Sequence, residues 1–476
     1  MHITMCRSSV ASSIGFAPVY YRLDRYGEHK RGEPISTMAP EERMKQTEGS
    51  HKVVTAAAAG GKMAVLHSPV GVRSIVTSLV AFFILASSVV FLLLDREAGL
   101  QEEPAIRAGG GGGDEECSWS RGRWVYDNVS RPLYDGLKCA FIFPEVACDK
   151  YGRKDVMYQH WRWQPHGHGC DLPRFDAMKL LEELRNKRLV FVGDSVNRNQ
   201  WVSLVCMVEA SIPDDRLKMR IFNGSLISFK ALEYNATIDF YWSPLLVESN
   251  SDNPIIHRVE YRIIRADRIE KHASVWRDAD VIVFNSYLWW RKQKDDMRMK
   301  VMYGSFEDGD AKLDEMEMAD GFEIAIKKLT EWLAKNIDKN KTRIFFAGSS
   351  PTHSWASNWG GQDKNKCLNE TEPISYRPGG GYKAATTDYS LMAMARSYFR
   401  RTLEPRGIRV QILNITELSD YRKDGHPTVF RRQFVPLTKE QIADPASYAD
   451  CTHWCLPGVP DVWNEFLYGY LTQQSK

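Results

Sequence analysis

Four short apolar runs after residue 187 limit the fold of this chain most narrowly. Turn-forming or polar residues bound each run, at 188–192, 281–284, 343–346 and 408–413. Short bounded runs of this kind are typical of buried strands. Helical patterns alternate with them, at 176–184, 196–208, 320–333 and 391–403. This alternation predicts an α/β fold, in which a parallel sheet has helices flanking it on both faces.

Two further regions carry weaker signals. Strand-like runs at 218–222, 238–242 and 258–264 predict an antiparallel extension of the sheet. The stretch 291–317 is highly charged, and we expect it to be an excursion on the surface.

Polar residues follow the ends of the predicted strands, where parallel sheets bind their ligands. They occupy 193–195, 285–286 and 348–353. Ser195 stands between a strand and a helix, so its hydroxyl should be exposed and its N–H should face a developing oxyanion. The plainer alternative is that Asp194 or Ser195 simply caps the helix.

Asp450 and His453 are three residues apart, a spacing that puts both on one face of a helical turn. The carboxylate would then hold one ring nitrogen, and the other would accept the proton of a serine. The alternative is a surface aspartate and a structural histidine. Cys451 and Cys455 flank the histidine and, if oxidised, would pin this turn rigidly.

The first 116 residues differ in composition from the rest. Residues 1–73 predict a disordered tail, 74–94 form an uncharged, largely apolar stretch of 21 residues, and 95–116 include five consecutive glycines that predict a flexible stem. About 20 apolar residues span a bilayer, so 74–94 predicts an uncleaved transmembrane signal anchor. Residues 117–476 then form the catalytic domain, with a Cys/Trp-rich segment at 117–175 and a core at 176–476.

Cysteines and glycosylation sequons indicate the orientation of this anchor. Eight of the nine cysteines follow it, and so do all six Asn-x-Ser/Thr sequons, at Asn128, Asn223, Asn235, Asn340, Asn369 and Asn414. Both features suit an oxidising compartment. We therefore expect a type II membrane protein with a cytosolic tail and a lumenal catalytic part.

Charge and motif content exclude several other classes. The net charge of +3 over 476 residues offers no basic stripe for nucleic acid. The glycines at 379–381 lack the Lys-Ser/Thr of a phosphate loop. His166, His168 and Cys170 resemble a metal cluster, but Cys170 is more simply explained by a disulfide. The sequence therefore predicts neither a bound cofactor nor a metal.

Eight ordered sequence blocks resemble the plant trichome birefringence-like family, polysaccharide O-acetyltransferases related to GDSL/SGNH esterases. The resemblance covers about residues 117–470. The blocks are CSWSRGRWVYDN (117–128), PLY (132–134), YQHWRWQP (158–165), CDLPRF (170–175), FVGDSVNRNQ (191–200), SPTH (350–353), DGHP (424–427) and DCTHWCLPG (450–458).

The resemblance implies an SGNH-like three-layer fold and a double displacement. The family's nucleophile falls on Ser195, and its other two catalytic residues fall on Asp450 and His453. Ser195 would take acetyl from a donor, either acetyl-CoA or an acetylated carrier, and a sugar hydroxyl deprotonated by His453 would take it from the serine. The candidates that help the Ser195 N–H to hold the oxyanion are Gly193, Arg198, Asn199 and Asn285.

An aromatic groove would favour transfer to sugar over hydrolysis by excluding water. Its candidate residues are Trp161, Trp163, Trp289, Trp290 and Trp454, and core packing is an equal alternative for each of them.

The resemblance also implies the pairs Cys117–Cys170, Cys139–Cys206, Cys148–Cys451 and Cys367–Cys455. Eight cysteines alone allow 105 pairings.

The expected acceptor is a cell-wall polysaccharide in the Golgi apparatus. Xylan is preferred because NRNQ (197–200) and GSFE (304–307) look most like the xylan-acting branch, and mannan, xyloglucan and pectin are the alternative acceptors. Other Golgi wall-synthesis proteins are candidate partners. A polysaccharide acetylesterase and a non-catalytic glycan-binding wall protein are the alternatives.

Overall fold

The structure is a computed structural model that describes residues 117–167, 169–291, 297–375 and 389–473. The predicted tail (1–73), membrane anchor (74–94) and stem (95–116) lie outside the described residues. Within these ranges no helix is both long enough and apolar enough to cross a membrane.

A seven-stranded mixed sheet forms the centre of the described chain, in the order β13-β12-β9-β3-β6-β5-β4. The first five strands run parallel, and β5 and β4 continue the sheet as an antiparallel hairpin. The strands are β3 Arg188–Gly193, β4 Lys218–Asn223, β5 Leu226–Ala231, β6 Ala236–Trp242, β9 Val281–Asn285, β12 Arg343–Ala347 and β13 Val410–Leu413.

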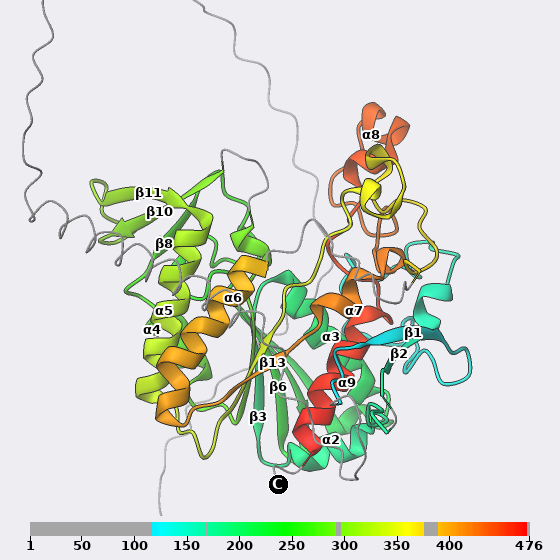
Figure 1. Ribbon diagram of the computed structural model, residues 1–476, viewed down its shortest axis with the longest axis horizontal. Coiled ribbons are helices and arrows are strands. Elements are labelled where there is room, and N and C mark those ends of the chain that lie inside the picture. Colours follow the sequence, from blue (N-terminus) through cyan, green and yellow to red (C-terminus); the bar gives the residue numbers. More distant parts are fainter. Residues whose placement is uncertain (1–116, 168, 292–296, 376–388, 474–476) are drawn as a thin grey trace, which may run out of the picture. The chain divides into compact units, whose positions relative to one another are not determined.

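Helices cover both faces of this sheet (Figure 1). One face packs against α2 Ala177–Glu183, α3 Ser195–Glu209 and α9 Val459–Thr472, and the other against α4 Glu270–Trp276, α5 Met318–Asn336 and α6 Tyr389–Tyr398. Strand β3 shows why: Leu189 and Phe191 enter the first core, whereas Val190 and Val192 enter the second. Alternate residues of a strand face opposite sides, so the two-sided apolar runs predicted from the sequence build three layers.

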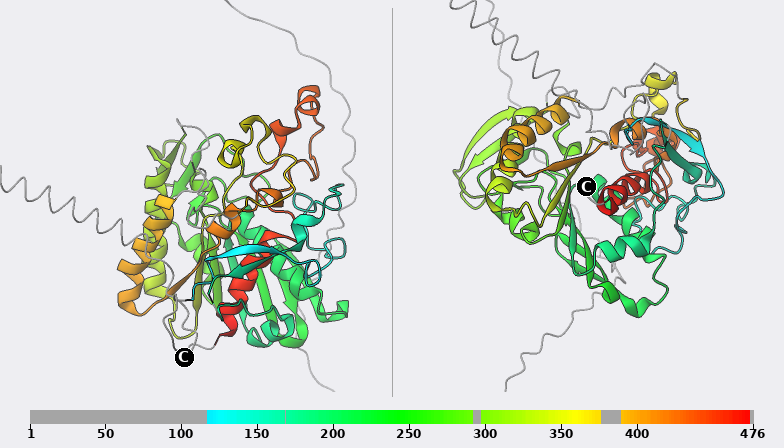
Figure 2. Two further views of the ribbon diagram at one scale, coloured as in Figure 1. Left: turned by 45° about the vertical axis from the view of Figure 1, so that its right-hand side comes forward. Right: turned by 60° about the horizontal axis from the view of Figure 1, so that its bottom comes forward.

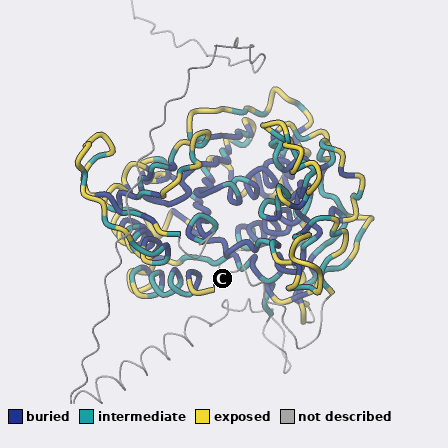
Figure 3. Tube along the Cα trace, turned by 90° about the horizontal axis from the view of Figure 1, so that it is seen from above, coloured by how far each residue is buried: buried dark blue, intermediate teal, exposed yellow. Residues whose placement is uncertain are grey.

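The buried residues follow the same layers. In Figure 3 the dark blue segments gather in the interior of the described chain, and the exposed yellow segments lie mainly toward its periphery.

Three predictions need correction, two of them because of a second, four-stranded sheet. It contains β7 Glu248–Ser249, β8 Arg262–Arg265, β10 Arg298–Tyr303 and β11 Lys312–Glu317. The run 258–264 contributes to this sheet instead of extending the main one, and 238–242 joins the main sheet parallel to β3.

The charged stretch 291–317 is likewise more than a surface excursion. It forms the β10–β11 hairpin, and Met299 and Val301 are buried against the α5 core. In β10 the apolar residues Met299 and Val301 alternate with charged residues, so one face of the strand packs on the core and the other faces outward.

The N-terminal described segment packs on the C-terminal helix. The antiparallel strands β1 Gly122–Tyr126 and β2 Trp161–Pro165 lie beside α9 and the short helix α7 Thr416–Asp420 (Figures 1 and 2). The Trp124 indole N–H donates to the Leu418 carbonyl at 2.7 Å. The Trp119 ring lies 5.1 Å from that of Tyr470, and a Cβ at Gly469 would approach it to 2.5 Å. The helix α8 Lys439–Ala443 begins with a Thr438 capping box.

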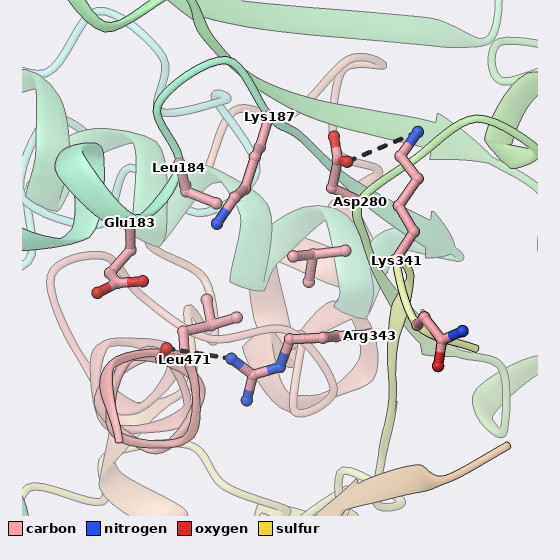
Figure 4. A pocket seen from close by; sticks show the side chains of 9 residues that line it. Glu183, Leu184, Lys187, Asp280, Lys341, Arg343 and Leu471 are labelled. Carbon is pink, nitrogen blue, oxygen red and sulfur yellow. Dashed lines mark hydrogen bonds and ion pairs between the residues drawn. The ribbon is translucent and has the colours of Figure 1, made fainter. Parts of the chain in front are cut away.

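A cavity of about 280 Å³ lies at the amino ends of β3, β9 and β12 (Figure 4). The Arg343 guanidinium there donates to the Leu471 carbonyl at 3.1 Å, and the Lys341 ammonium lies 3.7 Å from Asp280. The Arg343 contact ties the sheet to the end of α9, and the Lys341 contact joins the segments that lead into β9 and β12. Ser195 follows the opposite, carboxyl end of β3, so this cavity is distant from the predicted chemistry.

Candidate active site

Ser195 is the first residue of α3, and Asp194 alone separates it from β3. Asp194 caps this helix, and its Oδ1 accepts the N–H groups of Val196 at 2.8 Å and Asn197 at 3.4 Å. The capping alternative is thus correct for Asp194. It does not apply to Ser195, whose Oγ lies 2.8 Å from Nε2 of His453.

Asp450 and His453 meet through a tight bend and not through the predicted helical turn. Oδ1 of Asp450 accepts the N–H groups of Thr452 and His453, both at 3.0 Å. Its Oδ2 lies 2.8 Å from Nδ1 of His453. The imidazole therefore donates from Nδ1 to the carboxylate and can accept the Ser195 proton at Nε2. The three side chains form an unbroken relay.

Electrostatics suit the imidazole to the work of a base. Burial lowers the pKa of His453, but the charge of Asp450 and its hydrogen bond outweigh burial and raise the pKa above its usual value. Burial in turn raises the pKa of Asp450, and the His453 charge and three hydrogen bonds outweigh it and hold that pKa well below its usual range. Asp450 is therefore a carboxylate whenever the imidazole takes up a proton.

Four disulfides occur, and two of the predicted pairs are wrong. Cys117–Cys170 and Cys139–Cys206 are as expected, but Cys148 pairs with Cys455, and Cys367 pairs with Cys451.

Contacts at the two ends of the bend agree with these partners. Asp450 forms an antiparallel bridge with Thr428, and the neighbouring Cys451 Sγ accepts the Cys367 N–H at 3.2 Å. At the other end of the bend, the Leu456 N–H donates to the Val146 carbonyl at 3.1 Å, which places Cys455 beside Cys148. Both bridges still pin the catalytic bend, as predicted from the flanking cysteines.

Gly193 and Asn285 end neighbouring strands in close contact. A Cβ at Gly193 would lie 2.0 Å from the Asn285 carbonyl oxygen, so only glycine allows this approach. The Asn285 side chain is buried, and its Nδ2 has no hydrogen-bond partner among the described residues. A buried, unpaired donor beside the nucleophile suits an oxyanion site.

Arg198 and Asn199 follow on the first turns of α3. The Arg198 guanidinium lies over the Phe143 ring at 4.5 Å and 3.8 Å from Glu145, and its charge lowers the pKa of His453. Oδ1 of Asn199 accepts the main-chain N–H of Trp454 at 2.8 Å, so the Asn199 side-chain amide supports the catalytic bend.

Sequence reasoning missed two residues near this site. Asn197 is buried two positions after Ser195, and neither atom of its amide has a hydrogen-bond partner in the described ranges. Its place in the NRNQ block was the available signal. Arg291 donates to the Ser349 hydroxyl and the Ser350 carbonyl beyond β12. It was hidden in the charged stretch assigned to the surface.

Three of the five predicted groove tryptophans are core residues. Trp163, Trp290 and Trp454 are at most 3% exposed, and their indole N–H groups donate to the Trp119 carbonyl, Ser286 and Ser350. They cannot stack on a sugar because protein atoms cover both ring faces.

The other two tryptophans are partly exposed. Trp161 lines a hollow of about 180 Å³ with Arg123 and Trp124. Trp289 meets the Trp242 ring at 5.9 Å, and the Arg262 guanidinium lies over it.

Cys170, one of the three residues that resemble a metal cluster, is disulfide-bonded and so cannot bind a metal as a thiolate. His168 lies outside the described residues. In the part of the chain that the structure describes, no group of three His, Cys, Asp or Glu could hold a metal ion.

Sequence comparison relates this architecture to known proteins. Residues 172–470 match the PC-Esterase family, described as the GDSL/SGNH-like acyl-esterase family found in Pmr5 and Cas1p, and residues 115–171 match the PMR5 N-terminal domain. Xylan O-acetyltransferase 12 of Oryza sativa subsp. japonica is 68% identical over 89% of this chain and 92% of its own length. Xylan O-acetyltransferase 13 of the same plant is 67% identical over 89% and 93%. Protein trichome birefringence-like 34 of Arabidopsis thaliana is 51% identical over 75% and 85%.

Proposed function

The chain belongs to the PC-Esterase family of GDSL/SGNH-like acyl-esterases, and on this basis we propose that it transfers acetyl groups through Ser195 to hydroxyls of xylan. The observation that carries the proposal is the relay from Asp450 through His453 to Ser195, with both contacts at 2.8 Å. The names of the rice relatives support xylan as the acceptor.

The relay performs two displacements in succession. His453 takes the Ser195 proton as Oγ attacks the acetyl carbonyl of the donor, and the N–H of Ser195 and Nδ2 of Asn285 stabilise the oxyanion. The donor's leaving group departs with the proton from His453. A sugar hydroxyl then gives its proton to His453, attacks the acetyl-serine and restores the Ser195 hydroxyl. The donor is acetyl-CoA or an acetylated carrier.

Transfer and hydrolysis differ only in what reaches the acetyl-serine. The partly exposed rings of Trp289 and Trp161 offer stacking surfaces for a glycan, whose binding would displace water. An acetylesterase would use the same relay with water as acceptor, so the two functions are separated by the product.

We place the protein in the Golgi membrane as a type II protein anchored by residues 74–94. The four disulfides support a lumenal catalytic part. Five of the six sequon asparagines are exposed, which leaves them open to glycosylation: Asn128, Asn223, Asn235, Asn340 and Asn369. Golgi wall-synthesis proteins would then be its neighbours.

The test compares the wild-type chain with Ser195→Ala and with the control Ser211→Ala, an exposed serine at the end of α3. Each protein is incubated with an acetyl donor and a panel of xylan, mannan and xyloglucan oligosaccharides, and mass spectrometry follows the acceptor and residue 195. We expect acetylated xylo-oligosaccharide and acetyl-Ser195 from wild type and Ser211→Ala. The Ser195→Ala protein should lose at least about 1,000-fold in rate.

Other outcomes would contradict specific parts of the proposal. Free acetate without acetylated sugar would indicate an esterase, and acetylated mannan alone would replace xylan as the acceptor. An active Ser195→Ala protein would remove Ser195 from the mechanism.

A further inference from the structure

Two buried histidines that the relay does not use meet beside the catalytic bend. His353 belongs to the SPTH block and His426 to the DGHP block, and both are at most 1% exposed. Nδ1 of His353 lies 2.7 Å from Nε2 of His426. This is the distance of a hydrogen bond, so one of the two nitrogens must carry a hydrogen.

Counting ring protons shows that two neutral imidazoles cannot satisfy this arrangement. The outer nitrogen of His353, Nε2, lies 2.9 Å from the Asp420 carbonyl, and the outer nitrogen of His426, Nδ1, lies 2.7 Å from the His453 carbonyl. Carbonyl oxygens only accept, so each outer nitrogen carries the one hydrogen of a neutral ring. The inner nitrogens would then face each other with two lone pairs. One additional proton between them satisfies all three contacts.

We propose that His353 and His426 share one proton in the active protein, and that this pair holds the His453 imidazole in line with Ser195 through the His453 main-chain carbonyl. The pair contacts the bend at two further points. The main-chain N–H of His353 donates to the Cys451 carbonyl at 3.0 Å, and the His426 ring stacks on the Trp454 ring with 4.2 Å between their centroids. His353 and His426 are positioning residues, and their role in catalysis rests on the proposed function.

Three ion pairs and two further carboxylates surround the pair. Lys423 pairs with Glu370, Arg422 pairs with Asp424 at 2.8 Å, and Arg153 pairs with Asp155 at 3.2 Å while donating to the His426 carbonyl. Asp420 and Asp450 contribute two further carboxylates from the adjoining segments.

Opposing influences act on the proton of the pair. Burial removes the hydration of a charged imidazole and outweighs all other influences, so the pKa of His353 falls to about 4 and that of His426 lies well below its usual value. On His353 the hydrogen bond to the Asp420 carbonyl and the charges of Asp424 and Glu370 raise the pKa, whereas Lys423 lowers it. On His426 the charges of His353 and Arg153 lower the pKa, whereas the hydrogen bond to the His453 carbonyl and the charge of Asp450 raise it. The close contact adds to the effect of the carboxylates, since removing the proton leaves two lone pairs 2.7 Å apart. The proton therefore belongs to the pair and not to either ring.

Loss of the shared proton should loosen the catalytic bend. The two rings would move apart, and the His426 contact with the His453 carbonyl would weaken. Activity should therefore fall as pH rises through the pKa of the pair. This is opposite in sign to the titration of His453, which must lose its proton to act as a base.

Two substitutions at one position separate the proton from the packing. In His353→Asn the amide nitrogen takes the place of Nδ1 and donates to a neutral His426, so no shared proton is needed. We expect this variant to keep activity within about fivefold of wild type, as for one lost hydrogen bond, and to lose the alkaline fall. His353→Leu has no donor and should lose about 100-fold at every pH through misplacement of the imidazole.

The control is His160→Asn, a histidine that contacts the Arg131 carbonyl away from the relay, and it should reproduce the wild-type profile. An alkaline fall unchanged in His353→Asn, or full activity in His353→Leu, would overturn the inference. Thermal melting of each full-length variant reports whether it is folded.

Nitrogen NMR of the full-length protein labelled on histidine supplies a readout that needs no substrate. We expect a low-field proton coupled to one nitrogen of each ring, present in wild type and absent in His353→Leu. Two neutral rings throughout the active pH range would overturn the shared proton. A shared proton in a protein that transfers no acetyl would instead count against the proposed function, so the two failures are distinguishable.

Discussion

Asp450 and Asp194 both lie near His453, but their surroundings shift the pKa of the two carboxyl groups in opposite directions. Asp450 accepts hydrogen bonds from the His453 ring and from two main-chain N–H groups, and its pKa is held well below its usual range. Burial raises the pKa of Asp194 to about 6, and its Oδ2 has no partner within the described ranges. Asp450 is therefore the permanent charge of the site, and Asp194 shapes the turn that carries Ser195.

Asp450→Asn should change both the rate and its pH dependence. Without the carboxylate, burial dominates and the pKa of His453 falls. Because His453 acts as a base only when neutral, the rise in rate with pH should move to lower pH. The maximal rate should fall about 10⁴-fold, since an amide can hold the wrong tautomer. The measurement is single-turnover acetyl transfer from acid to neutral pH.

The matched control is Asp444→Asn, an exposed aspartate near the same bend, which should leave the profile unchanged. An acid limb that stays in place or moves to higher pH would contradict the assigned role of Asp450.

At the scale of elements, the catalytic bend belongs to no helix or strand. It is held by two disulfides, one on each side of His453, and by main-chain contacts to neighbouring loops. Irregular segments keep a fixed shape only where such constraints replace the regular hydrogen-bond ladders. The precision of the relay therefore depends on cross-links between distant parts of the chain.

Two double substitutions should separate the effect on stability from the effect on catalysis. Cys367 and Cys451 are 84 residues apart, and Cys117 and Cys170 are 53 apart. Loop closure gives each bridge about 4 to 5 kcal/mol of stabilisation. Replacing either pair by alanine should lower the melting temperature similarly, but only the Cys367/Cys451 variant should lose turnover, about tenfold or more.

Thermal melting and acetyl-transfer kinetics on the two variants check this prediction. Equal losses of turnover would show that the Cys451 bridge acts on overall stability alone.

For the whole described chain, the N-terminal segment and the C-terminal helix share one core. Trp119 and Trp163 lie in the same apolar cluster as Phe466 of α9 and Phe191 of β3. Two sequence families meet along the chain at residues 171 and 172, yet their side chains interlock. Folding of the described residues should therefore be cooperative across this boundary.

Trp119→Ala should test that cooperativity. The ring is 2% exposed against α9, so its loss should reduce the free energy of unfolding by about 3 to 5 kcal/mol while the urea transition stays single. The control Trp355→Ala removes a ring that is 53% exposed and should cost no more than about 0.5 kcal/mol. Two separate transitions in the Trp119→Ala protein would indicate independently folding parts.

The sequence alone determined the features that rest on local pattern. The two-sided apolar runs of β3, β9 and β12, the helices between them and the residue types around Ser195 and His453 all follow from nearby residues. The sequence pattern does not reveal strand β10, because charged neighbours mask the two-residue period of its apolar side chains. It suggests a helical turn at Asp450, because a helical turn and a tight bend both bring residues three apart together.

Only the tertiary structure decided the features that depend on which distant residues meet. The partners of Cys148 and Cys367, the burial of Trp454, and the contact of His353 with His426 join segments tens to hundreds of residues apart. Spacing along the chain carries no information about such meetings, because the packing of the whole core sets which side chains come together. The same packing brings Ser195 to His453, and so turns two short motifs into one site.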